Sequence, residues 1–206
     1  MNPALKKRIL RTLVIVLIGV AIGGLLALQE IANTPKQSPK PVAGIKIGGP
    51  FTLLNQDGET VTQDTYKGQP KLIYFGFTYC PAICPTELQK IARALNTLGT
   101  EGEDIQPLFI SVDPERDTSK VLKDYLSLYN PRLVGLTGTP QQISETLKEY
   151  RIYAAKVQDE NMNEYTMDHS SFIYFMDAED NLLGIYRSED PAEKIVSDVR
   201  QYLENR

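Results

Sequence analysis

The residues of this chain best suited to chemistry are its two cysteines and its one histidine. Cys80 and Cys84 lie in the run Phe-Thr-Tyr-Cys-Pro-Ala-Ile-Cys-Pro at residues 77–85, and the histidine is His169. Two thiolates and one imidazole form a ligand set suited to copper, and a close thiol pair can also carry two-electron redox chemistry. The sequence has no third cysteine and no second histidine, so a centre built from these residue types uses these three side chains.

The four-residue spacing of the cysteines leaves a metal site and a disulfide both open. At positions i and i+4 of a helical turn the Cβ atoms lie about 5–6 Å apart on one face. Two sulfurs can then converge on one ion at about 2.3 Å, and a disulfide needs only a small adjustment. The pair holds a metal only when it is reduced. A structural disulfide is the simpler interpretation in an oxidising compartment, but closing so short a loop stabilises a fold little.

Alternating apolar patterns predict the elements that carry these residues. The apolar run at residues 71–78 predicts a buried central strand that ends before Cys80, and Cys84 begins a helix that extends to residue 98. A helix N-terminus lowers the pKa of a cysteine placed there. The other expected elements are strands or extended segments at 106–112, 133–136 and 152–157, helices at 118–128, 140–150 and 191–203, and hairpins joining 51–54 to 59–62 and 171–176 to 182–187. This order predicts an α/β, thioredoxin-like fold with a mixed central sheet over residues 47–206.

His169 lies in the segment Thr-Met-Asp-His-Ser-Ser at 166–171, directly before the apolar strand predicted at residues 172–176. In thioredoxin-like proteins the loop before that strand packs against the cysteine turn. A lone histidine is more often a surface residue, but this location favours a metal ligand. Its neighbour Asp168 is expected to orient the ring or to supply a weak fourth oxygen ligand, with an ordinary loop acid as the equal alternative.

A third segment of interest runs from residue 112 to 118, Val-Asp-Pro-Glu-Arg-Asp-Thr. The pattern indicates a strand exit, a turn fixed by proline and a helix cap at Asp117 or Thr118. Asp113 is expected near the carboxyl end of its strand, where it is a candidate contact for a partner protein.

The N-terminal part predicts a membrane anchor. Residues 1–12 form a basic flank with Lys6, Lys7, Arg8 and Arg11, and residues 13–28 contain no charge. Counted from residue 9, the helix has about 20 residues, enough for the hydrocarbon core of about 30 Å. No small-x-small pattern follows, so we expect an uncleaved transmembrane helix rather than a removed signal peptide, and the first cysteine, Cys80, lies too far along for a lipoprotein. Residues 29–46 are rich in proline and lysine and predict an extended tether.

Charge restricts the partners of the remaining chain. Without the four basic residues of the flank, 18 Lys and Arg face 26 Asp and Glu, a net charge of about −8. This balance disfavours nucleic acid and favours cations or basic protein surfaces. The basic flank keeps the N-terminus cytoplasmic, so the folded domain is expected outside the membrane.

Three segments together resemble the Sco/SenC family of copper chaperones. They are Cys-Pro-Ala-Ile-Cys-Pro at 80–85, Val-Asp-Pro-Glu-Arg-Asp-Thr at 112–118 and Asp-His-Ser at 168–170, in the order of the family, and the similarity extends from about Ile47 to the C-terminus. The resemblance implies that Cys80, Cys84 and His169 bind copper, as Cu(I) or Cu(II), and deliver it to the binuclear copper centre of cytochrome c oxidase. The implied partners are the copper-bearing oxidase subunit and a copper donor or thiol reductant. The implied location is the bacterial inner (cytoplasmic) membrane, single-pass, with the domain on the periplasmic face.

Two alternative functions and one alternative metal follow from the sequence. Cys80 and Cys84 can serve as the redox pair of a thiol–disulfide oxidoreductase that reduces the cysteines of the oxidase copper site, although the chain lacks a proline between residues 140 and 191 to match the thioredoxin loop. Zinc also accepts two cysteines and one histidine. A peroxidase resembling the peroxiredoxins is disfavoured, because Thr78 lies two residues before Cys80 rather than three.

Overall fold

The computed structural model describes residues 13, 16–25, 46–158 and 164–205. Residues 16–25 form a helix. None of the helices in these described ranges is long and apolar enough to cross a membrane. The predicted cytoplasmic flank, nearly all of the predicted tether, and residues 14, 15 and 26–28 of the predicted anchor lie outside the described residues.

Residues 46–205 contain a seven-stranded mixed sheet. In chain order its strands are β1 (Thr52–Asn55), β2 (Thr60–Thr62), β3 (Lys71–Gly76), β4 (Gln106–Ser111), β5 (Val134–Thr137), β8 (Ile173–Met176) and β9 (Leu182–Tyr186). Their order across the sheet is β2-β1-β5-β4-β3-β8-β9. Strands β3, β4 and β5 are parallel, whereas the other pairs in this sheet are antiparallel. The mixed sheet and both predicted hairpins are confirmed.

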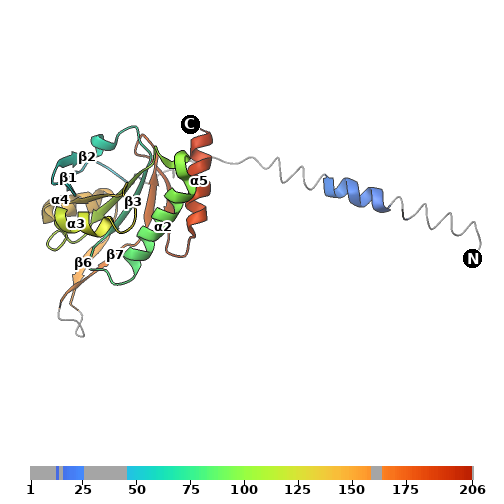
Figure 1. Cartoon of the computed structure of the whole chain (residues 1–206). Coiled ribbons are helices and arrows are strands. Elements are labelled where there is room, and N and C mark those ends of the chain that lie inside the picture. The colour runs from blue at the N-terminus through green and yellow to red at the C-terminus, as the bar shows by residue number, and fades with distance from the viewer. Residues whose placement is uncertain (1–12, 14–15, 26–45, 159–163, 206) are drawn as a thin grey trace, which may run out of the picture. The chain divides into compact units, whose positions relative to one another are not determined.

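Helices cover both faces of this sheet. They are α2 (Ile83–Leu98), α3 (Ser119–Leu126), α4 (Pro140–Glu149) and α5 (Ala192–Glu204), with short 3-10 turns η1 (Gln63–Tyr66) and η2 (Gly99–Gly102). Two right-handed crossovers in the same direction place α2 and α3 on one face, and α5 packs beside α2 (Figure 1). Helix α4 lies on the opposite face, where the ring of Tyr150 lies 5.2 Å from that of Phe75.

Strand β3 is the central element of the core. Every residue from Lys71 to Gly76 is buried, as expected of a strand covered on both faces. Helix α2 follows it and is a residue longer than predicted. Helix α3 is capped by Thr118, whose hydroxyl accepts a hydrogen bond from the N–H of Val121 at 3.3 Å. Of the two caps proposed from the sequence, Thr118 is therefore correct and Asp117 is wrong.

Two short strands form a separate hairpin that the sequence did not predict in full. Strand β6 (Ala154–Val157) pairs antiparallel with β7 (Thr166–His169), with Ala154 opposite His169. The expectation of a loop at His169 is wrong, because this residue ends a strand. The sequence Thr-Met-Asp-His shows little apolar alternation, and its pairing depends on a distant segment. In Figure 1 the hairpin extends from the end of the domain at which α2 begins.

Candidate metal centre

Both cysteines lie where β3 passes into α2. Cys84 is fully buried and Cys80 is 7% exposed, and both are free thiols. The residue at the N-cap of α2, Ala82, offers no side-chain cap. The sulfur of Cys80 takes that place, since it accepts a hydrogen bond from the N–H of Cys84 at 3.4 Å. A helix N-terminus therefore presents a backbone donor and its positive dipole to the Cys80 sulfur.

The two thiols differ in protonation because they share a hydrogen bond. The Cys84 thiol donates to Cys80, and this bond, working against burial, is the main cause that lowers the pKa of Cys80 to about 4. The same bond, followed by burial, raises the pKa of Cys84. At neutral pH the pair is thus a Cys80 thiolate beside a Cys84 thiol, and Cys80 is the nucleophile of the two.

The imidazole of His169 faces the same sulfurs. Its Nδ1 lies 3.0 Å from the carbonyl oxygen of Ser170. A carbonyl only accepts, so Nδ1 carries a proton and donates this bond, which leaves Nε2 as the ring nitrogen that faces the sulfurs. That Nε2 lies 3.7 Å from the sulfur of Cys84. Edge-to-face contacts with Phe77, at 5.7 Å between ring centroids, and Tyr74, at 6.5 Å, hold the ring in this orientation.

The separation of sulfur and nitrogen fits a shared ion. With zinc bond lengths as the yardstick, about 2.3 Å to sulfur and about 2.0 Å to nitrogen, a trigonal angle separates the two ligand atoms by about 3.7 Å. The observed Cys84–His169 distance is 3.7 Å. Over the described ranges, no group of three or more His, Cys, Asp and Glu side chains lies close enough together to hold a metal ion. The structure nevertheless brings Cys84 and His169 together directly, and Cys80 forms hydrogen bonds with both of them.

Asp168 does not orient the imidazole through its Nδ1. The Nδ1 partner is the carbonyl of Ser170. Side chains alternate along a strand, so the side chain of Asp168, the preceding residue of β7, points away from the face that carries His169, and Asp168 is exposed. The orienting role expected for Asp168 is therefore filled by a backbone oxygen.

Asp117 holds the turn that leads to Cys80. Its carboxylate is fully buried and accepts hydrogen bonds from the N–H of Thr78 at 3.1 Å, the hydroxyl of Thr78 at 2.6 Å and the hydroxyl of Ser111 at 2.6 Å. Burial raises the pKa of Asp117, opposed by these bonds. The side chain joins the end of β4 to the turn after β3, which fixes the backbone two residues before Cys80.

Asp113 is part of a second connection, to the β6–β7 hairpin. Its carboxylate, 1% exposed, forms an ion pair with Arg116 and accepts the hydroxyl hydrogen bond of Tyr165 at 2.9 Å. Arg116 donates to the carbonyl oxygen of Tyr165 at 2.8 Å, and its guanidinium lies 3.8 Å from the centre of that ring. Asp113 is buried, so the expectation that it contacts a partner at the surface is wrong. Tyr165 was not identified from the sequence.

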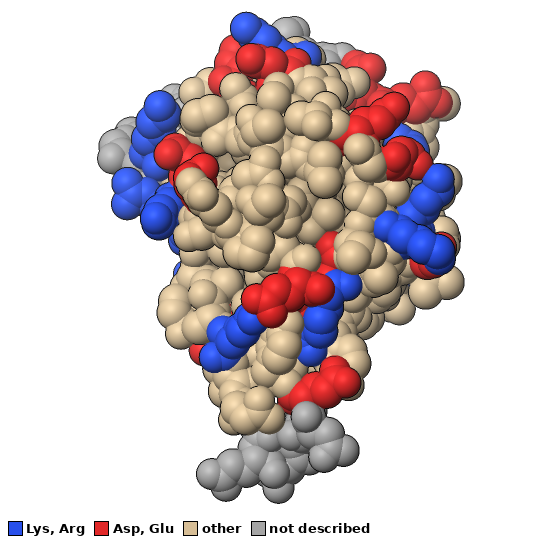
Figure 2. Space-filling model, turned by 90° about the vertical axis from the view of Figure 1, so that its left-hand side faces the viewer, with Lys and Arg blue, Asp and Glu red and all other residues tan. Residues whose placement is uncertain are grey.

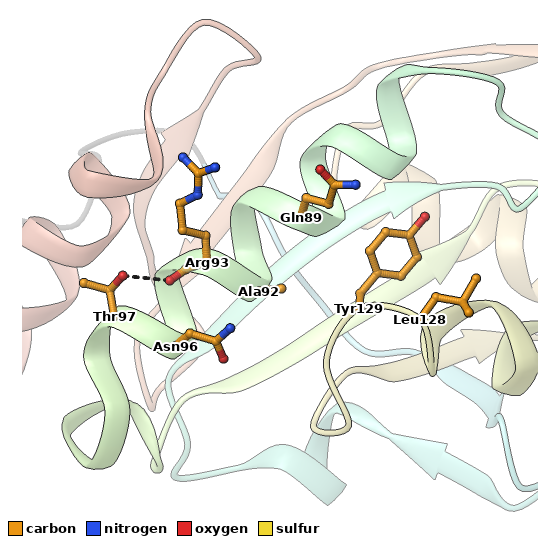
Figure 3. A pocket seen from close by; sticks show the side chains of 7 residues that line it. All are labelled: Gln89, Ala92, Arg93, Asn96, Thr97, Leu128 and Tyr129. Atoms are coloured by element: carbon orange, nitrogen blue, oxygen red, sulfur yellow. Dashed lines mark hydrogen bonds between the residues drawn. The ribbon is translucent and has the colours of Figure 1, made fainter.

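A groove on the outer surface of α2 lies apart from these residues. It has a volume of about 680 Å³ and lies between α2 and the turn after α3 (Figure 3). The residues that line it are Gln89, Ala92, Arg93, Asn96, Thr97, Leu128 and Tyr129. Since this set contains no cysteine, histidine or carboxylate, the groove offers no metal ligands of those types.

The chain has known relatives both in sequence and in fold. The sequence matches the family described as SCO1/SenC over residues 40–204. The chain belongs to that family. The SCO2-like protein of Rickettsia prowazekii is 38% identical over 201 residues, which cover 93% of this chain and 96% of that protein. The resemblance drawn from the three sequence motifs is confirmed.

Two solved structures of Sco proteins match the same domain. The copper-bound ScoI of Bradyrhizobium japonicum is 42% identical with a TM-score of 0.70, over 76% of this chain and 99% of that one. BsSco is 29% identical with a TM-score of 0.65, over 82% of this chain and 100% of that one. BsSco is a member of the Sco family of cytochrome c oxidase assembly proteins, and a disulfide switch has been identified in it. The α/β, thioredoxin-like fold with a mixed sheet is therefore shared with Sco structures.

Proposed function

We propose that this protein is a membrane-anchored metallochaperone that binds copper through Cys80, Cys84 and His169. Its cargo is delivered to the binuclear copper centre of cytochrome c oxidase. The observation that carries the proposal is the 3.7 Å separation of the Cys84 sulfur and the His169 Nε2, with Nδ1 bonded elsewhere. Two thiolates and an imidazole suit trigonal Cu(I), and Cu(II) is expected to add an oxygen ligand.

The comparisons support copper as the cargo. ScoI of Bradyrhizobium japonicum has been solved with copper bound, and so has yeast Sco1, which is 40% identical over 77% of this chain with a TM-score of 0.67. Soft thiolates select Cu(I), whereas zinc accepts the same residue types less selectively. The proposed oxidase partner follows from family membership, and nucleic acid is disfavoured by the charge. Figure 2 agrees with the argument against nucleic acid, because acidic and basic side chains are interspersed on the face it draws.

Copper binding is tested on the reduced full-length protein in detergent. The expected result is one Cu(I) per chain, held against a Cu(I) chelator, with two sulfur ligands and one nitrogen ligand in the X-ray absorption spectrum. His169→Ala removes the nitrogen ligand and lowers the affinity, and Cys80→Ser or Cys84→Ser removes a sulfur ligand. Unchanged copper affinity in His169→Ala would contradict the proposal.

A neighbouring residue supplies the matched control. Asp168 directly precedes His169 but is exposed, so Asp168→Ala is expected to bind Cu(I) like the wild-type protein. If both neighbouring variants lose copper equally, the effect comes from disruption of β7 rather than from loss of a ligand, and the assignment of His169 fails.

Delivery requires a separate measurement. Copper-loaded protein is mixed with the metal-free, copper-binding domain of the oxidase subunit, the two are separated, and copper is measured in each. Transfer of copper from the wild-type protein to the oxidase domain supports delivery. Copper-loaded Asp168→Ala is expected to transfer its copper as well, unless that variant is misfolded. Retention of all copper by the wild-type donor would contradict it.

A second candidate function is thiol–disulfide exchange with the cysteines of the oxidase copper site. The observation that favours it is the lowered pKa of Cys80, about 4, since a thiolate is the attacking species. A mixed disulfide between Cys80 and the oxidase domain, trapped in Cys84→Ser, is the expected product. Its absence, together with copper transfer by the wild type, favours the chaperone.

The membrane anchor at residues 13–28 is part of the proposal. The basic flank followed by an uncharged apolar run supports a single span with the folded domain on the periplasmic face of a bacterial inner membrane. The protein is expected to stay with the membrane fraction after alkaline extraction, and protease added to spheroplasts should digest the domain. Release by alkaline extraction would contradict the anchor.

A further inference from the structure

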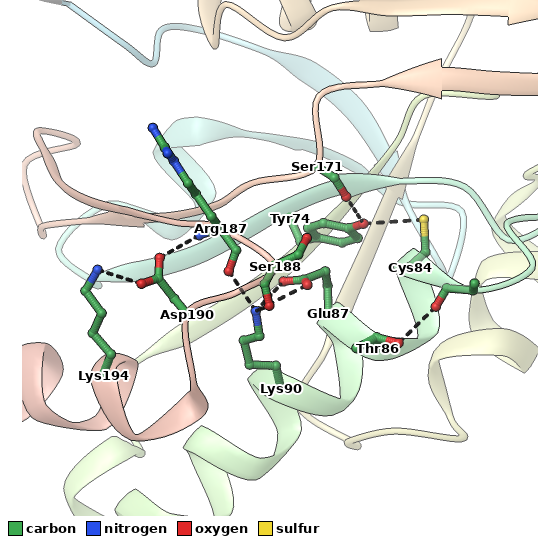
Figure 4. A network of polar contacts seen from close by, with 11 residues as sticks. Tyr74, Cys84, Thr86, Glu87, Lys90, Ser171, Arg187, Ser188, Asp190 and Lys194 are labelled. Atoms are coloured by element: carbon green, nitrogen blue, oxygen red, sulfur yellow. Dashed lines mark hydrogen bonds and ion pairs between the residues drawn. The ribbon is translucent and has the colours of Figure 1, made fainter.

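A buried tyrosine hydroxyl lies on the sulfur of Cys84. Tyr74 is fully buried in β3, and its hydroxyl lies 3.5 Å from the Cys84 sulfur (Figure 4). Its ring also lies edge-on to His169, with 6.5 Å between the ring centroids. Tyr74 thus contacts two of the three side chains of the candidate centre but can contribute no thiolate or imidazole itself.

Strand alternation and a glycine give the tyrosine this position. Tyr74 and Gly76 point to the same face of β3, the face covered by α2. A Cβ atom on Gly76 would lie 2.8 Å from the Tyr74 ring and 2.9 Å from the Cys84 sulfur. Because Gly76 has no side chain, the ring and the sulfur share the space above the strand.

A second hydroxyl determines the direction of the hydrogen bond. The Tyr74 hydroxyl lies 2.9 Å from that of Ser171, which follows β7 shortly after His169. A hydroxyl has one proton to donate and lone pairs to accept. The Tyr74 hydroxyl donates its one proton to the Cys84 sulfur, so Ser171 is the donor in the bond between the two hydroxyls. The hydrogen bonds from Ser171 to Tyr74 and from Tyr74 to Cys84, drawn in Figure 4, therefore link the segment after β7 to the thiol pair.

We propose that Tyr74 is a positioning residue that favours the reduced Cys80–Cys84 pair by donating its hydroxyl hydrogen bond to the Cys84 sulfur. A thiol or thiolate sulfur accepts this bond better than a disulfide sulfur, which carries less negative charge. The bond thus stabilises the state that can bind copper. The inference rests on the proposed function only in that these two cysteines are the working pair.

The affected equilibrium is exchange with glutathione. Glutathione disulfide oxidises the thiolate–thiol pair: the Cys80–Cys84 S–S bond forms, the glutathione S–S bond breaks, and two molecules of glutathione form, which take up the thiol proton and one proton from solvent. A typical hydrogen bond corresponds to about a fivefold change in an equilibrium constant. Loss of the Tyr74 bond is therefore expected to favour the disulfide about fivefold, a lowering of the reduction potential by about 20 mV.

The test is the reduction potential of Tyr74→Phe, measured on the metal-free full-length protein in glutathione redox buffers at pH 7. The matched control is Tyr186→Phe. Tyr186 is also buried, at 1% exposed, but its ring packs against α5, where the Nζ of Lys194 lies 5.7 Å from the ring centroid. We expect a fivefold shift toward the disulfide in Tyr74→Phe and less than a twofold shift in the control. A shift below twofold in Tyr74→Phe, or a shift toward the dithiol, overturns the proposal.

Two further measurements keep the proposal open to refutation if Tyr74→Phe folds poorly. Thermal unfolding of both redox forms should show a larger loss of stability in the reduced form, and an equal loss in both forms overturns the proposal. Ser171→Ala, at a half-buried position, should move the potential in the same direction by a smaller factor, and an unchanged potential again overturns it. If the wild type does not bind copper, the proposed function is wrong. The reduction potentials of the metal-free protein and its variants still test the role of Tyr74.

Discussion

The substitution Gly76→Ala puts one methyl group into the most crowded part of the candidate centre. Its Cβ would lie 2.8 Å from Cε1 of Tyr74, 2.9 Å from the Cys84 sulfur and 3.0 Å from Cε2 of Phe109. Non-bonded heavy atoms in contact prefer about 3.5–4.0 Å, so these neighbours must move by roughly 0.5 Å or more. All three are fully buried. Overpacking of this kind costs about 1–3 kcal/mol of unfolding free energy.

The same displacement alters the spacing of the proposed copper ligands. A sulfur moved off the strand no longer keeps its 3.7 Å separation from the His169 Nε2, so Cu(I) affinity should fall together with stability. Urea denaturation measures the loss of unfolding free energy, and competition with a Cu(I) chelator measures the loss of Cu(I) affinity. The control is Gly184→Ala in β9, where the nearest atom to an added Cβ is 3.6 Å away. Equal stability and equal copper affinity in Gly76→Ala and Gly184→Ala would refute the reasoning.

Three other outcomes follow from the buried charges. The lowered pKa of Cys80, about 4, keeps this residue a thiolate above that pH. Its alkylation rate should therefore change less than twofold between pH 8 and pH 6, whereas an ordinary thiol slows about a hundredfold. Mass spectrometry of the alkylated peptide measures this rate. Tyr165→Phe removes a donor from buried Asp113 and should cost about 1–3 kcal/mol in urea denaturation. Lys90→Met leaves the fully buried carboxylate of Glu87 without the cation drawn in Figure 4 and should lower the free energy of unfolding by about 3–5 kcal/mol. Adding Glu87→Met should recover most of this loss, and no recovery would contradict this account.

The parts of the fold that the sequence predicted are those with strong local patterns. The apolar run of β3 and the apolar face of α2 define their elements without reference to the rest of the chain, and their junction places Cys80 and Cys84. The hairpin of β1 and β2 follows from a turn at Asp57 and Gly58, where Gly58 has a φ of 81° that glycine adopts readily. Local chemistry is sufficient at these positions.

The features that the sequence did not predict depend on distant contacts. Strand β7 has only four residues with mixed polarity, and it forms because its backbone pairs with β6. Asp113 resembles a surface acid in the sequence, but its partners include Tyr165, which lies 52 residues away. The contact of Tyr74 with Ser171 joins residues 97 apart. A hydrophobic tyrosine in a buried strand carries no local signal of a polar role.

The segment at residues 113–118 explains how two distant loops come to face each other. Asp117 fixes the turn before Cys80 through Thr78, and Asp113 with Arg116 fixes the β6–β7 hairpin through Tyr165. Both anchors belong to one short turn, so a shift of either loop relative to the other must break buried hydrogen bonds. The distance between thiol and imidazole is therefore set by a segment that contributes no ligand of its own. It follows from the proposed copper site that substitutions at Asp113 or Asp117 should weaken copper binding while all three proposed ligands remain, which separates the geometry of the site from its chemistry.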